Sequence, residues 1–553
     1  MEFSLLEEPW IPCQYLDGSA REVSLKTVFQ DAASIRSVTG ELPTHTFVLV
    51  RLLLAIMHRA FKKRFEGDPV DEWEELWTQG LPVTEIHEYL ESYRDRFDLL
   101  HPVTPFYQVA GLHTAKHEVK DISPLLFDVP SNNRLFTARA GRGLDSLSLG
   151  EAARSLVHLH AFDVAGIKSG MVGDDRVKGG KGYPIGTGFD GNLGGVLIDG
   201  ESLEKTLLLN LVPNTSRDAS ADQPPWEREA DTAAVRAVGV PQGPVDLMTW
   251  QSRRVRLVSE EGRVVGCVVG NGDKVTPHNR YNFEAHSAWR YSPNQSNKGD
   301  YKGVDVYFPK EHSPERAFWR GIAGLSVMEH APLKAGGPSR FLPPKVVEWI
   351  AKLHDDGVLP RKFRVAPHAF GVDYGAQQSV VTDVLDDSFS LQLAVLHETH
   401  GARVSDAARA GVDVAEKAVA SLATLAGNIA LAAGGVDAVA RSRAFEEGYF
   451  AIDRPFRLWV AGLDLEQDAE AQLDEWKQRV RSIMSELERD IVDLAGEVAW
   501  KGRLAPVGRG QNPILMTTSV AQRRFREDLN RILLALSTQN ETEKSVAGAS
   551  THE

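Results

Sequence analysis

The 553-residue sequence has almost no cysteine. Cys13 and Cys267 are its two thiols, which is too few for a cysteine-rich zinc site. A chain of this size does not need a disulfide, and thiols stay reduced in the cytosol. We therefore expect both residues to be small, buried hydrophobic side chains.

Long apolar runs are also missing. No stretch approaches the roughly 20 uninterrupted apolar residues of a membrane-spanning helix. The segment Met1 to Glu8 is acidic and lacks the basic and apolar regions of a signal peptide. The sequence therefore predicts a cytoplasmic protein that makes no contact with a membrane.

Positive charge is scarce as well, because the formal net charge is −14. This value excludes a protein that coats nucleic acid through its overall charge. Any contact with phosphates must come from local basic segments, such as Arg253, Arg254 and Arg256 or the run at 361–364. Such runs are usually solvated faces, so they do not assign a function by themselves.

The first 380 residues mix helical and strand patterns. Apolar residues repeat with helical spacing over 47–65, and short β-rich runs at 255–258 and 264–269 flank a turn-like Glu-Glu-Gly break. Long stretches rich in glycine, proline, asparagine and aspartate lie between the patterned segments, and loops of this length are usually functional or disordered. We predict one large α+β domain over 1–380 that carries several functional loops.

The character changes to almost pure helix from residue 381. Apolar residues recur at steps of three and four near 384–399, 412–429, 473–498 and 525–536. Four amphipathic segments of this kind predict a four-helix bundle over 381–537. The polar residues 538–553 are expected to form a disordered tail. The predicted class is therefore α+β, with a large mixed N-terminal domain followed by a bundle.

Catalytic signatures fail when their structural context is considered. Gly186 to Gly191 satisfies G-x-G-x-x-G, but glycine-rich sequence precedes it where a strand is needed. Gly180-Lys181 lacks the first glycine and the hydroxyl residue of a P-loop, and His397 and His400 are spaced by three where a zinc-protease helix needs four. We therefore expect no enzyme, no cofactor and no metal. A metal-dependent nuclease and a purely structural scaffold stay open as alternatives.

Three segments have the composition of nucleic-acid contacts. The segment 134–143 alternates arginines with small residues and one phenylalanine, which offers phosphate contacts and a stacking surface. The segment 166–188 combines basic residues with many glycines, which let a backbone approach a ligand closely. At 374–379, paired glutamines offer hydrogen bonds to base edges.

These segments belong to an ordered series of motifs. The series is Trp10-Ile11-Pro12, His101-Pro102, Pro105-Phe106-Tyr107-Gln108, Leu135-Phe136-Thr137-Ala138-Arg139, Gly166-Ile167-Lys168-Ser169-Gly170, Leu207-Leu208-Leu209-Asn210-Leu211, Gln223-Pro224-Pro225-Trp226, Thr249-Trp250-Gln251, Trp289 and Gln377. In this order and spacing the chain resembles the CasA family, the large subunit of the type I-E CRISPR Cascade complex. The resemblance covers nearly the whole length.

The resemblance implies two groups of binding residues. The group expected at the 5′ handle of the guide crRNA is Arg134, Phe136, Thr137, Ala138, Arg139 and Arg142. The group expected at the short motif beside the target (the PAM) on double-stranded DNA is Gly166, Lys168, Arg280, Ala376, Gln377 and Gln378, with Lys274 as the alternative to Arg280. Gln377 corresponds to a glutamine wedge that begins duplex opening.

The resemblance also implies the partners. They are the crRNA, target DNA, the other Cascade subunits including the small-subunit dimer, and a separate helicase-nuclease that the complex recruits in antiviral defence. The chain departs from the family at a few places. Thr137-Ala138-Arg139 replaces Val-Asn-Gln after the loop phenylalanine, 172–182 is an insertion, and the single Cys267 excludes a zinc knuckle.

Overall fold

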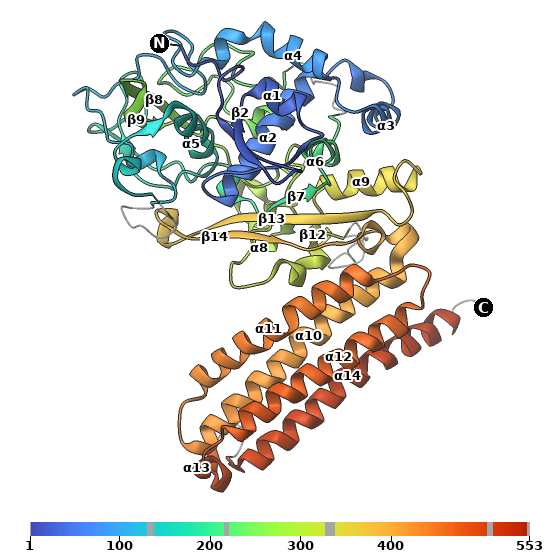
Figure 1. The fold of residues 1–553 in the computed structure, drawn as a ribbon. Coiled ribbons are helices and arrows are strands. Elements are labelled where there is room, and N and C mark those ends of the chain that lie inside the picture. The colour runs from blue at the N-terminus through green and yellow to red at the C-terminus, as the bar shows by residue number, and fades with distance from the viewer. Residues whose placement is uncertain are drawn as a thin grey trace. The chain divides into compact units, whose positions relative to one another are not determined.

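The computed structural model describes residues 2–129, 137, 139–214, 221–326, 338–505 and 513–549, with the backbone alone at 142, 300, 398–400 and 535–549. The chain divides into two compact units (Figure 1). The N-terminal unit contains Met1–Phe318, Val327–Arg361 and Val365–Ser388, and the helical unit contains Trp319–Ser326, Lys362–Arg364 and Phe389–Glu553. The predicted α+β class is confirmed, because small sheets and short helices build the first unit and long helices the second.

The N-terminal unit contains several small antiparallel sheets. Their strands are β1 (Ile11–Tyr15), β2 (Ala20–Val23), β3 (Ile35–Val38), β4 (Leu147–Ser148), β5 (Lys168–Ser169), β6 (Lys181–Gly182), β7 (Gly195–Asp199), β8 (Arg253–Glu260), β9 (Arg263–Asn271), β10 (Trp289–Tyr291), β11 (Tyr307–Pro309), β12 (Phe341–Leu342), β13 (Arg364–Tyr374) and β14 (Val381–Ser388). The strand orders are β2-β1-β3, β4-β9-β8 and β11-β10-β12, while β13 pairs with both β14 and β7.

The turn predicted between β8 and β9 is confirmed. Glu261 and Gly262 both have positive φ angles, +48° and +77°. Two consecutive residues of this kind form the two-residue turn whose twist matches that of a β-hairpin.

The N-terminal unit has nine α-helices in its described residues. They are α1 (Leu25–Gln30), α2 (Pro43–Ala60), α3 (Pro69–Gln79), α4 (Val83–Ser92), α5 (Leu149–Phe162), α6 (Leu203–Asn210), α7 (Pro244–Met248), α8 (Pro293–Ser296) and α9 (Lys345–Asp355). Of these, α4, α5, α6 and α7 contact α2. α2 begins with Pro43 and is buried from Phe47 to Met57, so it forms the centre of the core. The predicted burial of both thiols is confirmed, because Cys13 and Cys267 are at most 1% exposed.

The helical unit contains four long helices, α10 (Glu398–Ala433), α11 (Asp437–Gly462), α12 (Ala469–Asp493) and α14 (Thr518–Ala549). The short elements are β15 (Leu391–Gln392), α13 (Glu497–Lys501), β16 (Arg503–Ala505) and β17 (Ile514–Met516). Trp459 and Trp476 stack with ring centroids 5.2 Å apart, and the indole of Trp476 donates to the Gly411 carbonyl at 2.9 Å. Gly411 is required there, because a Cβ would lie 2.5 Å from the Trp459 ring.

One of the four predicted helices is wrong. Residues 381–388 form β14, which pairs with β13 in the N-terminal unit, and the fourth long helix is α11. Sequence reasoning missed α11 because Pro455 lies inside it and several of its apolar side chains, such as Phe450 at 87% exposure, face outward. A proline in a helix interior normally ends or bends the helix.

The helix α10 has the length and composition of a membrane span over Gly401–Ala433, but 67% of its most apolar window is buried inside the protein. Such burial is typical of a core helix. The backbone of α14 continues as helix to Ala549, while its side chains beyond Leu534 lie outside the described residues. The expectation of a disordered tail over 538–553 therefore stays a prediction.

Candidate nucleic-acid interface

β13 and β14 form a long hairpin (Figure 1). Gln377 lies in the short η9 segment, Ala376–Gln378, that connects the two strands. Gln377 and Gln378 both have left-handed backbone angles, with φ of +57° and +55°. For a residue other than glycine, this left-handed conformation is less stable than the right-handed one by roughly 1–2 kcal/mol. The Gly375 N–H donates to the Val380 carbonyl at 2.8 Å and closes the turn, and the Gln377 side chain is left exposed to solvent.

The glycine-rich loop, defined here as residues 163–188, leaves the end of α5 and returns to it. The Gly188 N–H donates to the Asp163 carbonyl at 2.9 Å and closes the stem of the loop. Inside the loop, β5 pairs with β6. A Cβ at Gly170 would lie 2.6 Å from Val177 and 2.8 Å from the Gly180 carbonyl, whereas a Cβ at Gly166 would meet open space. Residue 170 must therefore be glycine, because a side chain there would clash with the loop itself. The space beside Gly166 is open, so a ligand could approach the backbone there.

Arg253 braces both ends of the glycine-rich loop from inside the protein. Its Nη2 group donates to the carbonyls of Val164 at 3.1 Å and Gly186 at 2.9 Å, and its Nε group pairs with the Asp163 carboxylate. Arg253 is 1% exposed. This arginine was missed as a functional-site residue, because its sequence neighbourhood reads as a basic surface run.

The basic run beginning at Arg253 is not a solvated face. Arg254 is also 1% exposed, and its Nη2 group pairs with the Asp273 carboxylate at 3.0 Å. Arg256 is half-buried and donates to the Leu112 carbonyl at 2.7 Å. The expectation of a solvated surface run was wrong because each guanidinium finds acceptors from distant segments of the chain.

Lys168 lies in the glycine-rich loop and is held by the same carboxylate. Its Nζ atom is 2.6 Å from Asp163 Oδ2, and 13% of its side chain is exposed. Burial lowers the pKa of Lys168, against the opposing effect of Asp163. Burial alone would raise the pKa of Asp163, but the charges of Arg253 and Lys168 outweigh it and lower that pKa. Lys168 is therefore available to DNA only if its ion pair with Asp163 rearranges.

The structure brings the glycine-rich loop next to the glutamine turn, defined here as residues 375–380. The Ala165 N–H donates to the Gln378 carbonyl at 2.8 Å. The Tyr374 hydroxyl, at the end of β13, donates to the Phe162 carbonyl at 2.6 Å. Two of the segments that composition singled out thus share one surface, although they are far apart in the sequence.

A hollow of about 260 Å³ lies against the same loop. Its lining residues come from 120–129, 163–168, Val269 and Val381, so it reaches from the loop to the first residue of β14. Phe127, Val164 and Ile167 contribute apolar walls, and Lys168 with Asp163 contributes charge.

The predicted crRNA-handle segment is described only in part. Arg134, Phe136 and Ala138 lie outside the described residues, as does the side chain of Arg142. Thr137 is described, and its hydroxyl donates to Asp128 at 2.5 Å.

Arg139 is described and is occupied by protein carboxylates. Its guanidinium is 3.0 Å from Asp128, 3.2 Å from Glu151 and 3.7 Å from Glu41, and 11% of the side chain is exposed. These pairs fix the end of the handle segment to α5 and to the residues before α2. The expected phosphate contact of Arg139 stays a prediction, and it requires these ion pairs to open.

Within the described residues, the hydrogen bonds of the Arg280 side chain reach neither the glycine-rich loop nor the glutamine turn. In the described part of the chain, its guanidinium donates to the Thr276 carbonyl and hydroxyl, both at 3.3 Å. Burial lowers the pKa of Arg280. Lys274, the alternative, is exposed. Neither has a hydrogen bond that links it to the glutamine turn within the residues described.

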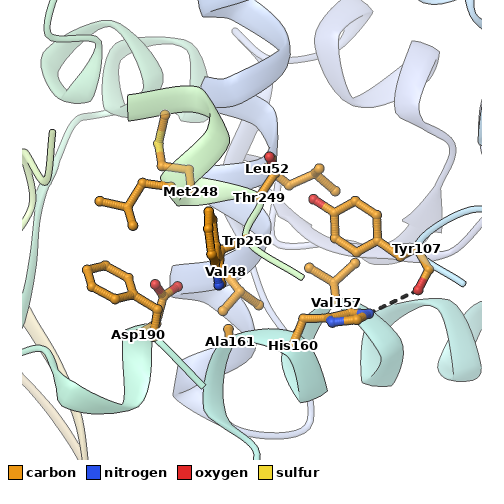
Figure 2. A pocket seen from close by; sticks show the side chains of 12 residues that line it. Val48, Leu52, Tyr107, Val157, His160, Ala161, Asp190, Met248, Thr249 and Trp250 are labelled. Atoms are coloured by element: carbon orange, nitrogen blue, oxygen red, sulfur yellow. Dashed lines mark hydrogen bonds between the residues drawn. The ribbon is translucent and has the colours of Figure 1, made fainter. Parts of the chain in front are cut away.

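The Gly186–Gly191 motif leads into the protein interior. It runs into η6 (Asp190–Asn192), which is too short to hold a pyrophosphate as a long helix does. Asp190, Trp250 and Tyr107 are among the residues that line a small pocket (Figure 2). Its volume is about 20 Å³, room for about one water. Burial raises the pKa of Asp190 to about 7, although Arg51 opposes the rise. This cavity is part of the core.

Comparison with known proteins first defines the class of fold. The Cse1 crystal structure from Thermobifida fusca is 41% identical to this chain with a TM-score of 0.86, and the match covers 96% of this chain and 98% of that one. The Cse1 structure from Acidimicrobium ferrooxidans is 28% identical with a TM-score of 0.78 and similar coverage, 96% and 98%. The mixed N-terminal unit and long-helix unit are therefore the Cse1 arrangement.

The sequence then assigns the family. Residues 4–487 match the family described as CRISPR-associated protein Cse1. The CasA/Cse1 protein of Thermus thermophilus is 32% identical over 334 residues, which are 59% of this chain and 60% of that protein. The chain belongs to the Cse1 family, also called CasA, the large subunit of type I-E Cascade. The resemblance inferred from the ordered motifs is confirmed.

Proposed function

We propose that this Cse1 subunit recognises the PAM on double-stranded target DNA and begins to open the duplex. A chain with the same fold, 17% identical with a TM-score of 0.61, comes from a structure titled CRISPR RNA-guided surveillance complex. In such a complex, base pairing with the guide reads the target while the protein reads the short adjacent motif.

The hydrogen bond from Ala165 to Gln378 carries the proposal. It sets an exposed amide side chain at a tight turn beside a loop whose Gly166 leaves space for a groove edge. The minor groove offers a degenerate pattern of donors and acceptors, so a backbone surface of this kind tolerates more than one motif. A side chain inserted next to the bound motif unstacks a base step at a cost of a few kcal/mol.

The direct test measures duplex binding and opening by the assembled complex. Gln377→Ala is expected to slow opening of PAM-bearing duplex, detected by a fluorescent base at the first target pair, and to leave subunit assembly unchanged. Gln79→Ala is the matched control, because Gln79 is also an exposed glutamine but ends α3. Equal opening rates for Gln377→Ala and the unchanged protein would reject the wedge role.

The remaining contacts form the second part of the proposal. The segment 134–142 anchors the subunit to the 5′ handle of the crRNA, and the long helices dock the small-subunit dimer. A separate helicase-nuclease, recruited by the assembled complex in the bacterial cytoplasm, cuts the DNA in antiviral defence. This chain itself carries out no chemistry.

Two other functions give different outcomes. A metal-dependent nuclease would cleave DNA as an isolated chain when Mg²⁺ is added. A scaffold would hold the complex together but give it equal affinity for PAM-bearing and PAM-scrambled duplexes. We expect no cleavage by the isolated chain and tighter binding of the complex to the PAM-bearing duplex.

A further inference from the structure

The glutamine turn is held in place by groups that lie outside its own hairpin. The bonds within the turn run from Gln378 N–H to the Gly375 carbonyl at 2.9 Å and from the Ser379 hydroxyl to the Ala376 carbonyl at 2.9 Å. Bonds of this kind close the turn but do not decide which way it points. Two consecutive non-glycine residues with positive φ also need outside support, because such strain persists only where the surroundings determine it.

The outside support comes from the stem of the glycine-rich loop. The Tyr374 hydroxyl donates to the Phe162 carbonyl at 2.6 Å, and the Ala165 N–H donates to the Gln378 carbonyl at 2.8 Å. Phe162 and Ala165 are three residues apart, so the two bonds hold the hairpin at two neighbouring points of one short segment.

The stem is itself held by hydrogen bonds from α5 and from Arg253. Phe162 is the last residue of α5, and the Asp163 N–H continues the helix by donating to the Leu159 carbonyl at 3.0 Å. Arg253 then fixes residues 163–164 and Gly186. The environment of the Tyr374 hydroxyl is tight as well, because a Cβ at Gly191 would lie 2.4 Å from it.

We infer that Tyr374 is a positioning residue that couples the glycine-rich loop to Gln377, so that docking of the loop on DNA sets the wedge in register. The inference rests on the proposed function and deepens it. Tyr374 does not touch DNA in this scheme, because its hydroxyl faces the Phe162 carbonyl inside the protein. Its loss should therefore affect opening and leave the first recognition of the motif intact.

The test uses Tyr374→Phe in the full complex with two DNA probes. One probe is a PAM-bearing duplex whose strands are cross-linked next to the motif, so that it reports binding alone. The other carries a fluorescent base at the first target pair and reports opening. We expect affinity for the cross-linked duplex to stay within about twofold and the opening rate to fall about fivefold, the factor that corresponds to one net hydrogen bond.

Tyr15→Phe is the matched control, because the Tyr15 hydroxyl donates to Asp31 at 2.8 Å in a different sheet. This variant loses a comparable hydrogen bond and should keep both values. The double variant Tyr374→Phe/Gln377→Ala should open DNA no more slowly than Gln377→Ala alone, because Tyr374 acts through Gln377. A merely structural role would instead give additive losses.

The outcomes separate the inference from the proposed function. If Gln377→Ala slows opening but Tyr374→Phe does not, the coupling is rejected and the wedge role stands. If neither variant slows opening, the wedge role itself is rejected. If Tyr374→Phe weakens binding to the cross-linked duplex as much as it slows opening, Tyr374 supports the whole site rather than the wedge, and the inference is overturned.

Discussion

Replacing Arg253 tests whether a buried arginine holds the glycine-rich loop in place. The guanidinium neutralises Asp163 and donates to the carbonyls of Asp163, Val164 and Gly186, and it is 1% exposed. Arg253→Met removes the charge and every donor but keeps much of the side-chain volume. Breaking a buried ion pair by removing one partner costs about 3–5 kcal/mol, and the lower end of that range applies here because Lys168 stays paired with Asp163. We expect a loss of that size in the free energy of unfolding of the N-terminal unit.

The assay is urea denaturation monitored by hydrogen exchange of peptides from β8 and β9. These peptides report the unfolding of the N-terminal unit separately from that of the helical unit. Trypsin provides a local measurement, because the loop contains Arg176, Lys178 and Lys181. We expect the Arg253→Met loop to be cut in mild conditions that leave the unchanged protein intact, because release of its stem raises local opening.

Arg263→Met is the control. Arg263 is exposed and donates to Ser146 at 2.8 Å, so its loss should cost less than about 1 kcal/mol. If Arg253→Met changes stability by less than about 1 kcal/mol and leaves the loop resistant to trypsin, the bracing role of Arg253 is refuted.

Three further predictions follow from single sites. Burial opposes protonation of His368, but hydrogen bonds to Asp199 and Asp386 raise its pKa to about 9. The contribution of protonated His368 to the stability of the fold should therefore be full below pH about 6.5 and lost as the pH rises through 9. His368→Gln should abolish this pH dependence in urea midpoints measured from pH 6 to 10. Arg139→Ala should weaken docking onto the RNA-bearing complex and lower the salt slope of docking by about one, the change expected for one lost phosphate contact. Equal weakening at low and high salt would reject that contact and leave Arg139 with its carboxylate partners alone. Gly166→Ala should leave the free energy of unfolding unchanged but weaken PAM binding, because the added Cβ meets open space. In Gly188→Ala the Cβ would lie 2.2 Å from the Ala161 carbonyl. That variant should lose about 1–3 kcal/mol of stability in the same denaturation assay.

Local pattern identified much of the fold. The helical periods at 412–429 and 525–536 lie within α10 and α14, and the Glu-Glu-Gly break is the β8–β9 turn. The period at 473–498 covers most of α12 but runs past its end at Asp493 into α13. These features were predictable because helical period and turn chemistry depend on residues a few positions apart. Helix α11 was not predictable in this way, because Pro455 and outward-facing apolar side chains interrupt its helical pattern of apolar residues.

The candidate site was predictable as separate segments and not as a surface. Glycine and glutamine composition singled out the loop and the turn, and the ordered motifs gave the family. The sequence gives no sign that Arg253 is buried or that Arg139 is held by carboxylates, because in each case the partners lie in other segments of the chain.

The amino-acid sequence alone determined the α+β class, three of the four long helices and membership of the Cse1 family. The tertiary structure decided which basic groups face outward and which loops meet. Tyr374 and Phe162 are 212 residues apart, and their contact depends on how β13 packs beside α5. Burial and long-range hydrogen bonds arise only when distant segments pack together, so no local pattern in the chain records them.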